Sequence, residues 1–348
     1  MSKINYTQVG YHYNGPLEFI DRTVDVSTLG PHDVLVKIAA AALNPVDLLL
    51  YNTAHIVKFF TRSDGGFGRD FAGVVESTGS AVTKFQVGDK ISGIFEPLFT
   101  QQGSVTEYLI VDTQKSHNIG TIPNNLTLEQ AAAFPLTFGT AYTTLTHFKK
   151  PAECENVLVL GGATSVGAFT IQLLKKVHKV KNVVTVNSAN SAERVKRYGS
   201  DIMIDYKKGN VKAQAIELAK DIGKFDLIID CVGGNDMLGC MSEVLKPKST
   251  GSGYVSINGA TVGDYRSSAL QFFTWDNVKL FFFPKKWNFK MSSIQEGTWY
   301  EYGKGLFEEG LLEIPIDSVH KYANYQDAIN TLLDHKAQGK VVITMASS

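Results

Sequence analysis

The sequence predicts an α/β protein that joins a β-rich domain to a doubly wound parallel sheet. Two patterns support this fold class. Residues 1–125 contain short apolar runs separated by Gly and Pro turns, which is typical of strands. From Thr127 onward, short apolar runs alternate with helical stretches, as in parallel strands that are covered by helices on both faces. At roughly 150 residues per domain, the 348-residue chain has room for two domains.

The first domain is expected to cover residues 1–126. Its clearest strand is the apolar run from Val34 to Ala42, which lies between the Gly30-Pro31 turn and Asn44-Pro45. Three more short runs are predicted as strands: Phe71–Glu76, Lys90–Ile94 and Val105–Val111. Glycine turns separate these runs, so we expect a small and irregular β-rich domain.

The second domain is expected to cover residues 127–270 and to begin with a helix. Thr127 precedes Leu128 to Ala133, a run of strong helix formers that a Thr side chain can cap. The runs predicted as parallel strands are Val157–Leu160, Val183–Val186, Leu227–Asp230 and Tyr254–Ile257. After the first run, apolar residues recur at helical spacing, as packing on a sheet requires. A third segment, 271–348, ends in a strand predicted at Val341–Met345.

Composition and charge exclude several classes of protein. The 34 basic and 34 acidic residues cancel, so no net positive field favours a nucleic-acid partner. The three cysteines, Cys154, Cys231 and Cys240, form no CxxC pair, which indicates a reducing compartment. No secretory signal pattern opens the sequence. We therefore expect an intracellular protein, either cytoplasmic or associated with an organelle membrane.

The sequence also lacks the donor pattern of a zinc enzyme. Catalytic zinc needs Cys, His, Asp or Glu ligands and one open position. The eight histidines are scattered, none pairs with a cysteine at ligand spacing, and three cysteines cannot build a four-cysteine site. No metal site is predicted.

A glycine-bearing turn follows the first predicted parallel strand. Residues 157–167 read VLVLGGATSVG, which is the order strand, turn and helix start. A dinucleotide site needs this order, because a pyrophosphate binds free backbone N–H groups at a helix N-terminus. The residues expected to line it are Gly162, Ala163, Thr164, Ser165 and Val166. The spacing is not G-x-G-x-x-G, so a tight turn without a ligand is the alternative.

The next strand indicates which dinucleotide is bound. An NAD site usually has an acidic residue at this strand end, where it binds the ribose 2′-hydroxyl. Here the run from Val183 ends in Asn187-Ser188. A 2′-phosphate tolerates the absence of an acidic residue, and Ser188 with nearby Arg194 could bind this phosphate. The sequence therefore favours NADPH over NADH. The alternative places Arg194 on an exposed helix face.

Several motifs occur in order along nearly the whole chain. They read ALNPVD at 42–47, GRDFAGVV at 68–75, VGD at 87–89, GSVTEY at 103–108, DCVGG at 230–234 and GKVV at 339–342. Together they resemble the zinc-free quinone oxidoreductase-like branch of the medium-chain dehydrogenase/reductase superfamily, among its fungal members. Most members of this branch carry a further glycine where this chain has Thr164 or Ser165.

The resemblance implies a GroES-like catalytic domain, a Rossmann domain, and a return of residues 271–348 to the catalytic domain. It further implies hydride delivery from NADPH to a quinone, an enal or enone, or a related electrophile, without zinc. Two alternatives stay open. One is an enoyl-thioester reductase, and the other is a catalytically weak NADPH-binding scaffold or redox sensor.

Roles for residues of the catalytic site also follow from the resemblance. Asn44 could donate its amide to the acceptor oxygen, or it could fix the turn before Pro45. Asp47 is expected to orient backbone rather than to ionise for catalysis. Tyr51 falls near the position of a pocket tyrosine. Thr137 is expected to touch the nicotinamide ribose side or simply to cap its helix.

Cofactor contacts are implied at the ends of three more strands. Val232 belongs to the strand end in the DCVGG motif. Ser256 and Asn258 follow the strand whose backbone holds the carboxamide in this family. Tyr206 resembles a position that packs beside the adenosine 2′-phosphate.

One further segment is rich in aromatic residues. Residues 271–289 hold eight aromatics in 19 residues, together with Lys285 and Lys286. Such a composition is typical of a peripheral membrane contact. The favoured interpretation is an aromatic lid over the substrate pocket or a subunit contact in a homodimer, because Pro284 and Asp276 interrupt any apolar face.

Overall fold

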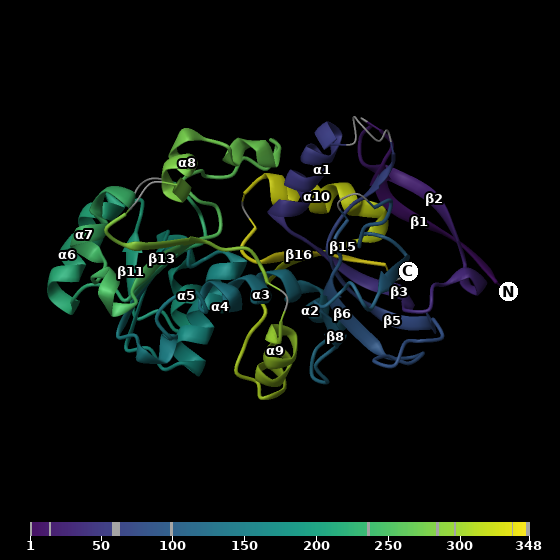
Figure 1. The fold of residues 1–348 in the computed structure, drawn as a ribbon, viewed down its shortest axis with the longest axis horizontal. Helices are drawn as coiled ribbons and strands as arrows, with labels where there is room; N and C mark the ends of the chain where they lie inside the picture. The colour runs from purple at the N-terminus through teal and green to yellow at the C-terminus, as the bar shows by residue number, and fades with distance from the viewer. Residues whose placement is uncertain are drawn as a thin grey trace.

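The computed structural model describes residues 2–13, 15–57, 63–97, 100–234, 237–282, 285–295, 297–335 and 337–345. The molecule is elongated, with the parallel-sheet domain at one end and the β-rich domain at the other (Figure 1). Helices α2 (Leu128–Ala133) and α3 (Pro135–Thr144) lie between them. Thr127 caps α2 as predicted: its Oγ1 accepts a hydrogen bond from Gln130 N (3.3 Å), and Gln130 Oε1 accepts one from Thr127 N (3.0 Å).

A seven-stranded sheet forms the centre of the β-rich domain in the described part of the chain. Its order is β15 (Ile316–Lys321), β16 (Lys340–Thr344), β3 (Asp33–Leu43), β5 (Asp70–Thr78), β6 (Lys90–Ile94) and β8 (Ile119–Thr121), with β7 (Tyr108–Asp112) also paired to β3. The predicted strands are confirmed, but β7 begins three residues later than expected. Val105 lies outside β7 because its backbone forms hydrogen bonds with Val9 and Phe67 instead. These bonds connect this part of the chain to a second sheet.

That second sheet is antiparallel and was not predicted. It contains β2 (Glu18–Asp25), β1 (Lys3–Tyr11) and β4 (Gly65–Gly66). Strand β1 buries only its last four residues, so its sequence shows no clear alternation of apolar and polar positions. Helix α1 (Pro45–Val57) connects β3 to this region.

The second domain is the predicted doubly wound parallel sheet. Its strand order is β11 (Ile202–Asp205), β10 (Asn182–Asn187), β9 (Asn156–Leu160), β12 (Leu227–Asp230), β13 (Gly253–Ser256) and β14 (Asn288–Met291). Each neighbouring pair is parallel. Val157 and Val159 pack into one hydrophobic cluster and Leu158 into another, so β9 is buried on both faces.

Helices cover both faces of the parallel sheet. They are α4 (Ser165–Gln172), which continues as a π-helical turn (Leu173–Val177), α5 (Ala192–Tyr198), α6 (Val211–Ile222) and α7 (Met241–Val244). Two further helices, α9 (Trp299–Glu308) and α10 (Tyr325–Leu333), follow β14. Helix α9 joins the domains, since the Trp299 ring packs on Phe138 of α3 while the Tyr300 hydroxyl bonds Ser92 of β6 (2.6 Å).

The aromatic segment forms a short 3-10 turn (Ala269–Phe272), helix α8 (Trp275–Phe282) and strand β14; Phe283 and Pro284 lie outside the described residues. Phe273 and Phe282 are 83% and 80% exposed, whereas Leu280 is buried. In the described ranges, no helix combines the length and apolar character that crossing a membrane requires.

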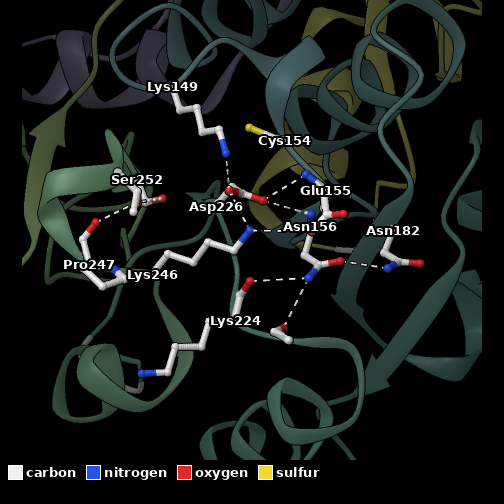
Figure 2. Close-up of polar contacts among 12 residues, drawn as sticks. Lys149, Cys154, Glu155, Asn156, Asn182, Lys224, Asp226, Lys246, Pro247 and Ser252 are labelled. Carbon is white, nitrogen blue, oxygen red and sulfur yellow. Dashed lines mark hydrogen bonds and ion pairs between the residues drawn. The ribbon is translucent and has the colours of Figure 1, made fainter.

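The buried Asp226, directly before β12, connects several segments at the amino-terminal edge of the parallel sheet (Figure 2). Its Oδ1 accepts from Lys149 Nζ (2.7 Å) and Lys246 Nζ (2.9 Å), and its Oδ2 accepts from the backbone amides of Glu155 (2.9 Å) and Asn156 (3.2 Å). Burial alone would raise the pKa of Asp226, but these hydrogen bonds hold it below its ordinary value.

We expect Asp226→Ala to lower the free energy of unfolding at pH 7 by about 3 kcal/mol, because two backbone amides and two lysines lose their acceptor. Since the folded state lowers this pKa, the advantage of the wild type is full above the ordinary value of 3.8 and shrinks as the pH falls below it. Urea unfolding at several pH values measures this. Glu217→Ala, which removes an exposed ion pair with Lys220, should change little; an equal loss in both variants would contradict the prediction.

Candidate functional site

The predicted cofactor residues meet at the carboxyl edge of the parallel sheet. This follows from topology, because the carboxyl ends of parallel strands share one edge and ligands bind in the crevice outside it. The residues come from the loops after five neighbouring strands: Gly162 to Val166 after β9, Ser188 after β10, Tyr206 after β11, Val232 after β12, and Ser256 and Asn258 at and after the end of β13.

Glycine is required at three positions of the turn after β9. Gly161 has φ +78°, which L-residues with a side chain rarely adopt. A Cβ on Gly162 would lie 2.9 Å from Thr185 Cβ, and one on Gly167 would lie 2.2 Å from the Gly161 carbonyl oxygen. The turn therefore brings helix α4 tightly against β9.

Thr164 is the N-cap of α4. Its Oγ1 accepts from Gly167 N (3.0 Å) and donates to the Gly161 carbonyl (2.9 Å). The first-turn amides of Ser165 and Val166 have no intrahelical acceptor by the geometry of an α-helix. They remain able to bind an anion, so the turn fits a pyrophosphate although it carries a threonine.

Of the residues expected at the adenosine end, Arg194 has a partner elsewhere in the protein. Ser188 is half-buried just after β10, and Tyr206 is 52% exposed after β11. Arg194 donates to Gln338 Oε1 (2.7 Å), in the segment before β16, so its guanidinium is directed to the β-rich domain. Asp205, the last residue of β11, lies beside Asn187 of β10 in the sheet register, is buried and accepts from Lys207 N (2.9 Å).

Asp230 fixes the ends of β12 and β13. This buried carboxylate accepts from the Tyr254 hydroxyl (2.5 Å), the Ser256 hydroxyl (3.2 Å) and the Val232 amide (2.9 Å). Asn258 Nδ2 donates to the Val232 carbonyl (3.0 Å). Burial raises the pKa of Asp230 in spite of these hydrogen bonds. Val232, Ser256 and Asn258 are thus held as one rigid unit.

In the β-rich domain, Asn44 belongs to a buried polar network. Its Nδ2 donates to Asp70 Oδ2 (3.0 Å) and to the Ala42 carbonyl (3.3 Å), and its Oδ1 accepts from Lys340 Nζ (2.5 Å). Lys340 also pairs with Asp70 Oδ2 (2.9 Å). Both amide hydrogens of Asn44 are directed to protein acceptors, so this geometry favours the turn-fixing interpretation over donation to an acceptor oxygen.

Tyr51 and Thr137 also have partners within the protein. The Tyr51 hydroxyl donates to the Gly15 carbonyl (3.1 Å), and its ring packs edge-on against Tyr11 (centroids 5.0 Å apart). The Thr137 hydroxyl bonds back to the carbonyls of Ala133 (3.4 Å) and Phe134 (3.3 Å). Tyr51 lines a narrow pocket together with Asp47, whereas Thr137 is buried in the first turn of α3.

Three residues of this region received no role from the sequence: Asp70, Lys340 and Asp230. Asp70 and Asp230 lie in the GRDFAGVV and DCVGG motifs and Lys340 in GKVV, so the motifs were visible. The pairing was not, because Asp70 and Lys340 are 270 positions apart.

The side chains near Asn44 do not fit a zinc ion. Asp70 Oδ2 accepts from Lys340 and Asn44 and its Oδ1 from Leu136 N (3.0 Å), while Arg69 is a cation paired with Glu96. In the parts of the chain that the structure describes, no group of three or more His, Cys, Asp or Glu side chains is placed to hold a metal ion.

Comparisons with known proteins agree with this architecture. The family described as "Alcohol dehydrogenase GroES-like domain" matches residues 30–122, and the one described as "Zinc-binding dehydrogenase" matches residues 198–343. The protein named YIM1 of Saccharomyces cerevisiae is 32% identical over 330 residues, 90% of each chain. YIM1-2 of Lachancea thermotolerans is 33% identical over 355 residues, 98% of each chain. The structure of a quinone oxidoreductase from Coxiella burnetii superposes with a TM-score of 0.74 at 24% identity, covering 99% of this chain and 100% of that one.

We expect Lys340→Met to lower the free energy of unfolding by about 3 to 5 kcal/mol, because it leaves the buried Asp70 carboxylate without its cation. Chemical denaturation measures the loss. Lys115→Met removes an exposed lysine that pairs with Asp112 in the same domain and should leave stability nearly unchanged. A Lys340→Met protein as stable as Lys115→Met would show that the buried pair carries no stability.

Proposed function

Because the chain belongs to the medium-chain dehydrogenase/reductase superfamily of oxidoreductases and is similar to fungal YIM1 proteins, we propose that it uses NADPH to reduce a small quinone, enal or enone without a metal ion. The observation that carries this proposal is the turn from Gly161 to Gly167. It presents two first-turn amides of α4 at the edge where the loops of five parallel strands meet.

The pyrophosphate would be held by the amides of Ser165 and Val166 and by the Ser165 hydroxyl. The adenosine end would lie beside Ser188 and Tyr206. NADPH is preferred over NADH because Asn187, rather than an acidic residue, ends strand β10 and Ser188 follows it. A carboxylate there would repel a 2′-phosphate.

When bound, the dihydronicotinamide supplies a hydride to an electrophilic carbon. The chain's own residues orient the ring and the substrate. Val232, Ser256 and Asn258, which Asp230 holds in place, would position the carboxamide side of the ring. Thr137 lies in α3 between the two domains and would border the ribose.

Helix α8 would serve as a cover that excludes water from this site. Asn277 of α8 accepts from Ala260 N (2.7 Å) and donates to Thr261 Oγ1 (3.1 Å), which fixes the helix to the loop after β13. The segment before α8 is tied to α1, because Asn52 Nδ2 donates to the Ser267 carbonyl (3.0 Å) and Ala269 N donates to Thr53 Oγ1 (2.9 Å). These contacts support the lid interpretation over a membrane contact; the exposed Phe273 and Phe282 would lie in a homodimer contact.

We expect purified protein to bind NADPH at least about tenfold more tightly than NADH, because no acidic residue ends β10. Titration of cofactor fluorescence measures both affinities. Tighter binding of NADH would contradict the assignment of the 2′-phosphate. Absence of binding for both cofactors would instead favour a scaffold without turnover.

Ser165→Asp is expected to weaken NADPH binding by at least about tenfold, because a carboxylate would face the pyrophosphate across a short distance. Ser242→Asp on α7 adds the same charge at an exposed position of the same domain and should leave the affinity unchanged. The same fluorescence titration compares the two variants. Equal affinities would show that the pyrophosphate does not bind at Ser165.

A further inference from the structure

The buried carboxyl group of Asp230 is held by hydrogen bonds rather than by an ion pair. It ends β12 and is 1% exposed, and no cation pairs with it in the part of the chain that the structure describes. Its Oδ1 accepts from the backbone amides of Val232 (2.9 Å) and Gly233 (2.8 Å). Its Oδ2 accepts from the hydroxyls of Tyr254 (2.5 Å) and Ser256 (3.2 Å). These four donors therefore stabilise the group in place of a cation.

Tyr254 makes the shortest of these four contacts. Burial raises the pKa of Asp230, and the hydrogen bond from Tyr254 is the largest of the effects that oppose this rise. Burial and the neighbouring Asp230 also raise the pKa of Tyr254 well above its ordinary value of 10.0. The tyrosine hydroxyl therefore keeps the proton that it donates.

The ring of Tyr254 is fixed by two aromatic residues of the segment 271–289. The Trp287 ring meets it edge-on with the centroids 5.8 Å apart, and the Phe289 ring stacks on it at 5.9 Å. Phe289 is also its neighbour in the register of β13 and β14, and Tyr254 is 1% exposed. Packing therefore directs the hydroxyl at Asp230, and this part of the aromatic segment contributes to the parallel-sheet domain.

The same carboxyl group connects the loops that follow β12 and β13. Ser256 Oγ, which donates to Asp230, accepts from the backbone amides of Gly259 (2.8 Å) and Asn258 (3.3 Å). The carbonyl oxygen of Gly259 in turn accepts from Gly234 N (3.2 Å). The two loops are thus one unit built around a single carboxyl group.

We propose that Tyr254 is a positioning residue of the cofactor site: its hydroxyl orients the carboxyl group of Asp230, which holds the loops after β12 and β13 in the conformation that borders the nicotinamide end. This assignment rests on the proposed function and adds a residue that touches neither cofactor nor substrate. Its effect is confined to the nicotinamide end, because Ser188 and Tyr206 at the adenosine end follow β10 and β11, on the far side of β9.

The test compares two ligands that share the adenosine end. The oxidised cofactor NADP⁺ fills the whole site, whereas adenosine 2′,5′-bisphosphate lacks the nicotinamide half. Calorimetric titration measures both dissociation constants in the wild type and in Tyr254→Phe, which keeps the ring and removes only the hydroxyl. We expect Tyr254→Phe to bind NADP⁺ about tenfold more weakly, because the loops then adopt the binding conformation in only a fraction of the molecules. Its affinity for adenosine 2′,5′-bisphosphate should equal that of the wild type.

Two further variants separate this role from a general loss of packing. Tyr300→Phe removes another buried hydroxyl, which bonds Ser92 (2.6 Å) in the β-rich domain, and should change neither affinity. Asp230→Asn should also weaken the binding of NADP⁺. The double variant Asp230→Asn/Tyr254→Phe should bind NADP⁺ within about twofold of Asp230→Asn alone, because Tyr254 acts through this carboxyl group.

A second measurement needs no cofactor. The amide hydrogens of Val232 and Gly233, which are donated to Asp230, should exchange with solvent about tenfold faster in Tyr254→Phe than in the wild type. The amide of Gly167, which donates to Thr164 Oγ1 in the turn after β9, should exchange at the same rate in both proteins.

Four results would overturn the assignment: an equal loss of affinity for both ligands, no loss for either, losses that add in the double variant, or unchanged amide exchange at Val232 and Gly233. Failure of the proposed function looks different. A wild type that binds neither ligand, while the two amides still exchange faster in Tyr254→Phe, would overturn the cofactor site and leave only the ordering of the loops by Tyr254.

Discussion

The carboxylate of Asp70 is the interaction on which the arrangement of both domains depends. One of its oxygens binds Lys340 of β16 and Asn44 after β3, and the other binds the amide of Leu136 at the start of α3. A buried charge is tolerated only when it is paired and its remaining lone pairs are satisfied. The three partners come from three elements, so satisfying this one group fixes the sheet, the turn before α1 and the helix between the domains.

The two edges of the parallel sheet show opposite uses of polar groups. At the amino-terminal edge, Asp226 accepts hydrogen bonds from two lysines and two backbone amides (Figure 2). At the carboxyl edge, Asp230 accepts hydrogen bonds from the backbone amides that follow β12. The first-turn amides of α4, in contrast, have no hydrogen-bond acceptor within the helix. The amino-terminal edge is rigid, whereas the carboxyl edge has unsatisfied backbone donors. An anionic cofactor would therefore gain the most binding free energy at the carboxyl edge.

The fold could be predicted from the sequence to a large extent, because buried parallel strands read as continuous apolar runs and Thr127 marks the first helix. Strands β1, β2, β4, β8, β11, β14 and β15 were missed, since they are partly exposed or only a few residues long. Among site residues, the turn at Gly161 was visible as a local motif. The direction of Arg194 toward Gln338 and the pairing of Asp70 with Lys340 depend on contacts 144 and 270 positions apart, which no local pattern encodes.

The distance along the chain between Asp70 and Lys340 also bears on biosynthesis. At roughly 5–20 residues per second, a ribosome takes on the order of tens of seconds to extend the chain from one to the other. During that interval β3 and β5 can pair, yet the carboxylate lacks its cation and the side of β3 that β16 will occupy stays open. The nascent β-rich domain is therefore an incomplete sheet, with part of one edge of β3 unpaired until the strand that carries Lys340 arrives.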